Sequence, residues 1–215
     1  MNKFQTVKTA LKLMTAICAL AVSTGAQANL ISVTSPFGPP NVTFSGLPSA
    51  APLNGLAING FTFSETISNT FVRVGGPGNT NDITQPSALG NANPAGEIIT
   101  VAMPSMTSEF GFGYAILAGG VVPNAVTISL FNNATDLGSL SYTGSPDPTF
   151  PGGFAGIESS NAFNIAEITF NPKAAAYDFD NITAIKAIPE PVTLSIFGTG
   201  LAAALATRRR KQKTA

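Results

Sequence analysis

Short apolar segments, many of them alternating with polar residues, recur between turn-forming residues through the middle of the chain. No segment between residues 29 and 187 shows the 3.6-residue period of an amphipathic helix. The pattern predicts ten short strands, at residues 42–44, 56–63, 70–74, 98–103, 110–117, 126–131, 137–142, 154–157, 165–170 and 177–185. Many short strands with frequent turns favour an all-β fold, an antiparallel β-sandwich or barrel.

Two stretches between these strands are turns or loops. The run from Asn132 to Asp136 separates two alternating segments and is the best candidate for a hairpin turn. Residues 75–96, rich in Gly, Asn and Pro, predict a long irregular loop. Their glycines lack the GK[ST] sequence and the following helix of a phosphate-binding loop.

The first 28 residues have the pattern of a secretory signal peptide. Its parts are three lysines, an apolar run at 13–22, and a cleavage site whose small residues are Ala26 and Ala28. A lipoprotein modified at Cys18 and a retained membrane anchor are the alternatives, but the sequence before Cys18 is a poor lipobox and the apolar run is shorter than a membrane span of about 20 residues.

A second apolar segment follows a proline-rich hinge near the other end of the sequence. Pro189, Glu190 and Pro191 form the hinge, because proline interrupts both strands and helices. Residues 192–207 predict an apolar membrane helix, and the basic end at 208–213 begins with a stop-transfer cluster of Arg208, Arg209, Arg210 and Lys211.

These three elements, in this order, resemble the PEP-CTERM sorting signal of Gram-negative, exopolysaccharide-producing bacteria. The resemblance implies processing near Pro189, Glu190 and Pro191 by the membrane enzyme exosortase, after export by the Sec machinery. It also implies a precursor anchored transiently in the inner membrane and a mature form at the cell surface or secreted. An ordinary tail anchor with a proline-rich stalk is the alternative.

Charge is distributed unevenly, although the whole chain is formally neutral. Residues 29–188 hold ten acidic side chains and three basic ones, a net charge of about −7. Such a body repels phosphate backbones, which argues against nucleic-acid binding. The chain has no histidine and no tryptophan, so the commonest general base and the best sugar-stacking ring are missing.

Asp178, Asp180 and Asn181 are the weak candidates for a calcium site. Residues 178 and 180 lie on one side of a strand, and their oxygens suit calcium. A solvated sheet edge with a turn cap is the preferred alternative. The sequence predicts no other metal site and no cofactor.

Residues 123–185 resemble, more weakly, exported jelly-roll domains of the galactose-binding-like kind. The resemblance rests on the strand 126–131, the segment Phe154-Ala155-Gly156-Ile157-Glu158-Ser159 and the closing Asp180-Asn181-Ile182. It implies a jelly-roll sandwich at 29–187 between a signal peptide at 1–28 and a sorting tail at 188–215.

The expected role of the sandwich is structural or adhesive, at the cell surface or in a biofilm matrix, without enzymatic activity. An extracellular carbohydrate-binding module with exopolysaccharide as its partner is the alternative. Its available sugar platforms are Tyr114, Tyr142, Tyr177 and some phenylalanines. A glycoside hydrolase is a weaker alternative, since two carboxylates can suffice. Its candidate carboxylates would be Glu97, Glu109, Glu158 and Glu167.

Overall fold

A computed structural model describes residues 28–92 and 97–188. It contains ten strands in this range: β1 (Leu30–Val33), β2 (Ala57–Ile58), β3 (Phe61–Glu65), β4 (Phe71–Arg73), β5 (Ser87–Gly90), β6 (Ile99–Leu117), β7 (Val126–Asn132), β8 (Thr135–Tyr142), β9 (Gly152–Phe170) and β10 (Ala176–Lys186). Every pairing between them is antiparallel.

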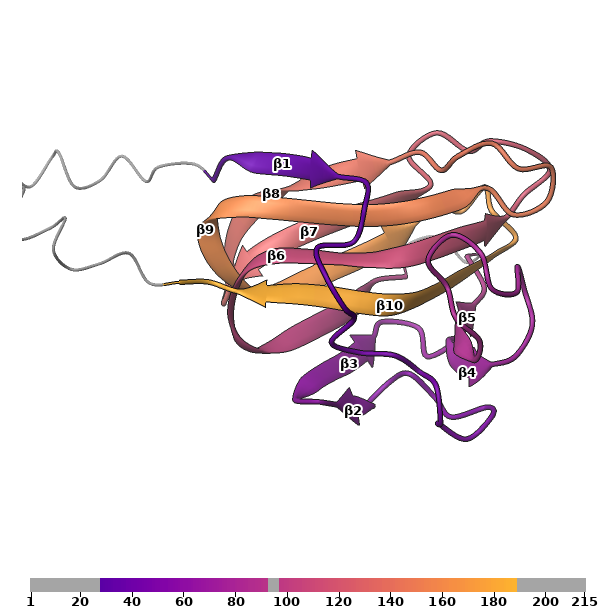
Figure 1. Cartoon of the computed structure of the whole chain (residues 1–215), viewed down its shortest axis with the longest axis horizontal. Coiled ribbons are helices and arrows are strands. Elements are labelled where there is room, and N and C mark those ends of the chain that lie inside the picture. The colour runs from indigo at the N-terminus through magenta and orange to yellow at the C-terminus, as the bar shows by residue number, and fades with distance from the viewer. Residues whose placement is uncertain (1–27, 93–96, 189–215) are drawn as a thin grey trace, which may run out of the picture.

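Two long strands, β6 and β9, fold this network of strands into two layers (Figure 1). Residues 99–102 of β6 and residues 165–168 of β9 pair with each other, with β3 on one side and β7 on the other. The remaining parts of β6 and β9 pair with each other between β10 and β1. Register shifts between Ala102 and Glu109 mark the corner at which the strands pass from one layer to the other.

The predicted all-β fold, an antiparallel β-sandwich, is confirmed, with changes at the level of single strands. The segments predicted at 98–103 and 110–117 form one strand, β6, and those at 154–157 and 165–170 belong to one strand, β9. Residues 42–44 make only an isolated bridge, from Val42 to Ile182. The region predicted as a loop at 75–96 contains β5, and β1 was not predicted.

The core between the layers is aromatic. Phe110, Phe112, Tyr114 and Ile116 alternate along β6 and are all buried on the inner face. Phe179 of β10 packs edge-on against Phe112, with ring centroids 5.7 Å apart, and other phenylalanines extend this cluster. Burial of these large side chains is the main stabilising contribution to the fold.

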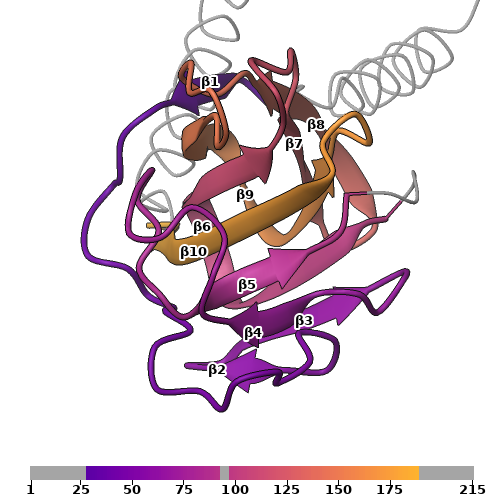
Figure 2. The ribbon, with the colours of Figure 1, turned by 90° about the vertical axis from the view of Figure 1, so that its right-hand side faces the viewer.

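The outer face of the layer that contains β10 is covered by the segment that joins β4 to β5. In an end view, β2, β3, β4 and β5 lie along one side of the sandwich (Figure 2). Gly113 of β6 permits the close approach of this segment, because a Cβ atom there would overlap the main-chain oxygens of Asn81 and Asp82. Two acidic residues of β10 are buried beneath the same cover.

The ends of the described chain leave the sandwich together. Asn29, just before β1, exchanges hydrogen bonds with Ser160, and Ala187, just after β10, donates to the carbonyl of Met106. The start of β1 and the end of β10 lie at the left-hand end of the sandwich in Figure 1. No helix among residues 28–92 and 97–188 could cross a membrane. The predicted signal and membrane helices lie outside the described residues.

Candidate functional site

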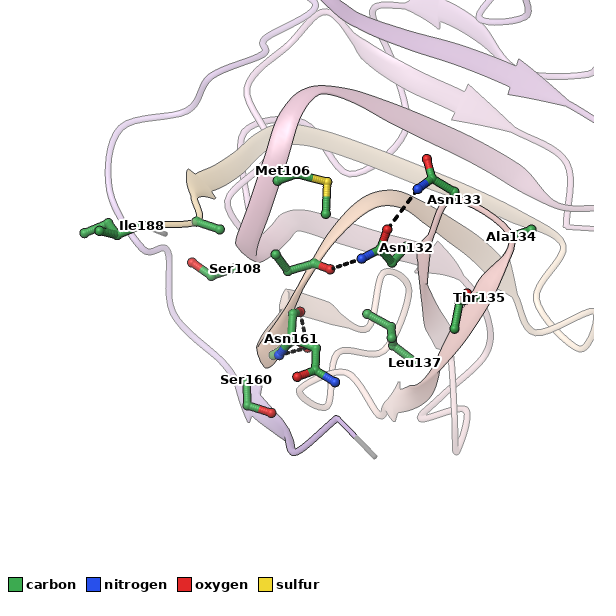
Figure 3. A pocket seen from close by; sticks show the side chains of 13 residues that line it. Met106, Ser108, Asn132, Asn133, Ala134, Thr135, Leu137, Ser160, Asn161 and Ile188 are labelled. Carbon is green, nitrogen blue, oxygen red and sulfur yellow. Dashed lines mark hydrogen bonds between the residues drawn. The ribbon is translucent and has the colours of Figure 1, made fainter. Parts of the chain in front are cut away.

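A large pocket lies at the end of the sandwich where Asn29 and Ile188 emerge (Figure 3). We call it the end pocket; its volume is about 1100 Å³. Four elements build it: the β7–β8 turn, the corner of β9, the corner of β6, and the residues after β10. The lining consists of Met106, Ser108, Asn132, Asn133, Ala134, Thr135, Leu137, Ser159, Ser160, Asn161, Ala162, Ala187 and Ile188.

Hydrogen bonds hold the polar side of the end pocket in place. The Asn132 amide donates to the carbonyl of Ala162 at 3.1 Å, and the Asn133 amide donates to Asn132 Oδ1 at 3.0 Å. The Ser159 hydroxyl donates to the carbonyl of Asn161 at 2.7 Å. The turn itself follows from the sequence, since Asn133 adopts the left-handed conformation that asparagine tolerates, with φ of 53°. The predicted hairpin at 132–136 is thus confirmed.

No side chain of the end pocket is charged at neutral pH. Its walls offer hydroxyl and amide groups, which can both donate and accept hydrogen bonds, next to the apolar side chains of Met106 and Leu137. This combination suits an uncharged ligand with many hydroxyl groups better than it suits a phosphate or a metal ion. The lining contains no group that could act as a general acid or base at neutral pH.

The predicted sorting residues begin at the rim of this pocket. Ala187 and Ile188 line it, and Pro189, Glu190 and Pro191 follow directly in sequence but lie outside the described residues, as do the basic residues 208–211. Of the predicted signal cleavage residues, Ala28 is half-buried at the start of the described chain, and Ala26 lies outside it. The structure therefore tests none of these predicted roles.

Asp178 and Asp180 lie on the outer face of β10, opposite Ala115 and Gly113 of β6. Both are buried, with exposed fractions of 2% and 0%, which corrects the preferred alternative of a solvated edge. Asp180 Oδ1 accepts the N–H of Phe44 and its Oδ2 accepts the N–H of Thr84, each at 3.1 Å. Burial raises the pKa of both carboxyl groups to about 6, against the lowering effect of these and other hydrogen bonds.

Asn181 turns away from a shared site with these two acids. Its side-chain amide donates to the carbonyl of Asp82 at 2.7 Å and to Thr84 at 3.2 Å, and its φ is 53°. Within residues 28–92 and 97–188, no three acidic, histidine or cysteine side chains gather into a group that could hold a metal ion. Calcium binding at these residues stays a prediction. In the structure, Asp180 and Asn181 hydrogen-bond to the segments that cover this face.

The four glutamates considered as hydrolase carboxylates lie in different parts of the structure. Glu109 and Glu158 face each other across β6 and β9, and burial, followed by the charge of Glu158, raises the pKa of Glu109. Glu167 pairs with Thr100 in the other layer. Glu97 is buried beside Glu65. Glu65 was not selected from sequence patterns, because its partners come from distant segments. None of the four lines the end pocket.

The tyrosines available as sugar platforms are all inside the protein. Tyr114, Tyr142 and Tyr177 are exposed by only 1%, 6% and 2%. Tyr177 stacks on Phe170 with ring centroids 4.1 Å apart, and the Tyr142 hydroxyl donates to the carbonyl of Gly156. These rings are therefore part of the core and are closed to an external sugar.

Comparison with solved structures returns carbohydrate-binding modules of family 29. One such module is 13% identical over 79% of this chain and 99% of its own length, with a TM-score of 0.38. A variant of the module CBM29-2 in complex with cellulohexaose is 13% identical over 75% of this chain and 94% of its own, again with a TM-score of 0.38. At this level of similarity, the ligands of those modules do not transfer to this chain. No curated protein matches the sequence.

A family model matches the segment that begins one residue after β10. Residues 187–211 match the PEP-CTERM protein-sorting motif, which covers Pro189, Glu190, Pro191 and the basic residues 208–211. This confirms the resemblance drawn from the order of hinge, apolar segment and basic cluster, and the motif implies exosortase-dependent export. The chain accordingly carries a PEP-CTERM sorting motif, which indicates an exported protein, directly after an antiparallel β-sandwich.

Proposed function

We propose that this protein is a structural or adhesive component of the cell surface or extracellular matrix of a Gram-negative bacterium. In this proposal, the Sec machinery exports the chain, residues 192–207 anchor it in the inner membrane, and exosortase processes it near Pro189, Glu190 and Pro191. The observation that carries the proposal is the direct connection between the last strand and the sorting motif: β10 ends at Lys186, and the motif begins at Ala187.

The arrangement of the sandwich supports a role as a displayed module. Asn29 and Ile188 leave at one end, so a tether at either terminus holds the opposite end and both layers away from the attachment point (Figure 1). The covered outer face and the aromatic core give a rigid body. We infer a role without catalysis, since the carboxylates that a hydrolase would need are either buried or separate from the end pocket.

The sorting part of the proposal is tested in the native host with the substitution Glu190→Ala. Wild-type protein is expected to lose residues 1–28 and the tail beyond the Pro-Glu-Pro segment, and the variant is expected to stay in the membrane fraction at higher mass. Intact mass spectrometry of each fraction measures both. Asp147→Ala, which removes one exposed carboxylate in the β8–β9 connection, is the control and is expected to be processed as wild type.

Retention of the arginine-rich tail by wild-type protein would contradict processing by exosortase. The chain would then be an ordinary tail-anchored ectodomain, and a role in the released matrix would be abandoned. Processing of wild type and Glu190→Ala at equal rates would instead show that Glu190 does not take part in recognition.

The end pocket supports a second candidate function, the binding of a neutral polysaccharide. Its hydroxyl and amide groups are held in place by hydrogen bonds, and no charged side chain competes with uncharged sugar hydroxyls. Exopolysaccharide of the producing organism is the expected ligand class. Because no aromatic ring lines the pocket, affinity per site is expected to be low, with dissociation constants in roughly the millimolar range.

Affinity electrophoresis in gels that contain the host polysaccharide tests this candidate. Thr135→Arg places a long charged side chain at the exposed rim of the pocket and is expected to abolish any retardation that wild type shows. Ser139→Arg adds the same side chain at an exposed position of β8 outside the pocket and is expected to behave as wild type. If the polysaccharide retards none of the three proteins, polysaccharide binding is contradicted and the structural or adhesive role is favoured.

A further inference from the structure

Two glutamates from different segments meet inside one side of the sandwich. Glu65 ends β3, and Glu97 comes just before β6; Glu97 is only 6% exposed. The main chain joins the two segments, since the N–H of Thr66 donates to the carbonyl of Ile98 at 3.1 Å. We call Glu65 and Glu97 the glutamate pair.

Hydrogen bonds from neighbours satisfy one oxygen of each carboxyl group. Glu65 Oε1 accepts the N–H of Thr70 at 3.1 Å, and Glu97 Oε2 accepts the hydroxyl of Tyr177 at 3.0 Å. Tyr177 and Thr70 also join their hydroxyls at 2.6 Å. The second oxygens, Glu65 Oε2 and Glu97 Oε1, are buried and have no hydrogen-bond donor within the described chain.

These second oxygens are exceptional for this protein. Among the described residues, only one other buried side-chain polar atom lacks a partner, and it is Oδ1 of Asp178. An unsatisfied buried carboxylate oxygen is destabilising, so folded proteins rarely leave one without a proton, a water or an ion. Two such oxygens on neighbouring residues call for a common explanation.

Beside Glu97, the described residues offer neither a basic side chain nor space for a water molecule. The void beside Glu97 has about 180 Å³ of empty space but no room for a water molecule, and its other walls are Ala92, Ile99, Ile168, Phe170 and Tyr177. The titratable groups that face Glu97 are Glu65 and Tyr177, and neither carries positive charge. Burial raises the pKa of Glu97 to about 7; hydrogen bonds from Tyr177 and Asn69 oppose this, and the charge of Glu65 adds to it.

We propose that Glu65 and Glu97 share one proton between their unsatisfied oxygens, and that this proton fastens the β3–β4 connection to the segment before β6. Loss of the proton to solvent leaves two negative charges in a space that excludes water. The repulsion is relieved when the two segments separate and water enters. The pair is therefore a pH-dependent latch on this side of the sandwich.

The direction of the pH effect follows from the raised pKa. The folded protein holds the proton more tightly than the unfolded chain, whose glutamates titrate near 4.5. Stability from the pair is thus fully present below about pH 4.5 and is lost as the pH rises through about 7. This is the reverse of the behaviour of a carboxylate that is paired with a lysine or arginine.

Thermal unfolding of the full chain in detergent, at about pH 5 and about pH 8, tests the latch. Wild type is expected to melt at a lower temperature at the higher pH, and Glu97→Gln is expected to reduce this difference by about 5 °C. Glu167→Gln, a half-buried glutamate of β9 outside the pair, is the control and is expected to keep the wild-type difference. Should Glu97→Gln fail to fold, Glu65→Gln removes the same pairing and is expected to act alike.

Hydrogen exchange at Thr70 separates a latch from a merely structural glutamate. Because this amide donates to Glu65, its protection in wild type is expected to fall about tenfold from pH 5 to pH 8 after correction for the intrinsic rate, and to stay constant in Glu97→Gln. An unchanged pH dependence in Glu97→Gln would overturn the proposal. Stabilisation of wild type, but not of Glu97→Gln, by calcium chloride at pH 8 would also overturn it, and would assign the pair to a cation instead.

Discussion

Asp180 connects three segments that are far apart in sequence. Its two oxygens accept main-chain N–H groups of Phe44 and Thr84, and the residue is completely buried. Both donors belong to connections without regular strand pairing of their own, so this side chain replaces the ladder bonds that those N–H groups lack. One carboxylate thus fixes two covering segments to β10.

Removal of this side chain is expected to be costly. Asp180→Ala leaves two N–H groups without their acceptor and is expected to lower the free energy of unfolding by about 2–4 kcal/mol. Urea unfolding followed by fluorescence or circular dichroism measures the change. Asp136→Ala removes one exposed acceptor, for the N–H of Gly138, and is expected to cost less than about 1 kcal/mol. Equal losses for the two variants would contradict the role of Asp180 as a clamp.

Single residues also show where inference from the sequence reaches its limit. The alternation of β10 correctly places Asp178 and Asp180 on one face, because side chains along a strand alternate. Whether that face is open or covered depends on residues 75–86, which have no periodic pattern. Burial of the two aspartates, and the meeting of Glu65 with Glu97, are products of tertiary packing that spacing along the chain does not encode.

At the scale of elements, small residues on the outer face of β6 decide how closely the cover can approach. Gly113 stands opposite Asp180 in the neighbouring strand, and the space above it is filled by the main chain of Asn81 and Asp82. A Cβ atom at residue 113 would have to displace these main-chain atoms, which move less easily than the end of a flexible side chain. The position of the β4–β5 connection therefore depends on the absence of a side chain at residue 113.

Gly113→Ala is expected to displace the β4–β5 connection and to destabilise the protein by about 1–3 kcal/mol. The measurement is urea unfolding, supported by proteolysis within residues 75–86, which is expected to become faster. Gly119→Ala is the matched control, since a Cβ atom there meets nothing within 4 Å. A neutral effect at 113 would mean that the covering segment can move aside at little cost.

The elements themselves were largely predictable. Alternation and turn residues located eight of the ten strands and the β7–β8 hairpin, because these features are local. The continuity of β6 and β9 across their corners was not predicted, since Pro104 and the polar residues around each bend have the composition of a loop. The end pocket exists because of those corners, and so its residues were not selected from the sequence.

On the scale of the whole molecule, burial of acids without basic partners governs the response to pH. Asp178, Asp180 and Glu97 all have a pKa raised chiefly by burial, to about 6, 6 and 7. A raised pKa means that the folded state binds these protons more tightly than the unfolded state does. Stability is therefore greatest on the acid side of this range and declines between about pH 4 and pH 7.

The full chain is accordingly expected to resist urea better at about pH 5 than at about pH 8, by at least about 2 kcal/mol. The midpoint of urea unfolding as a function of pH measures this. Asp178→Asn and Glu97→Gln in one chain should flatten the curve, while Glu167→Gln should leave it steep. A maximum of stability near pH 8 would show that ion pairs or a bound cation dominate instead.

The direct junction between β10 and the sorting motif has a mechanical consequence. β10 lies between β5 and β6, and nearly its whole length is paired with β6. Tension applied through Ala187 pulls β10 along its own axis, so the hydrogen bonds of both ladders bear the load in parallel and must break together. Tension applied across the strand would instead break these bonds one at a time. A surface protein held by this strand would resist shear from flowing liquid, and its connection would yield later than one made through a frayed terminus.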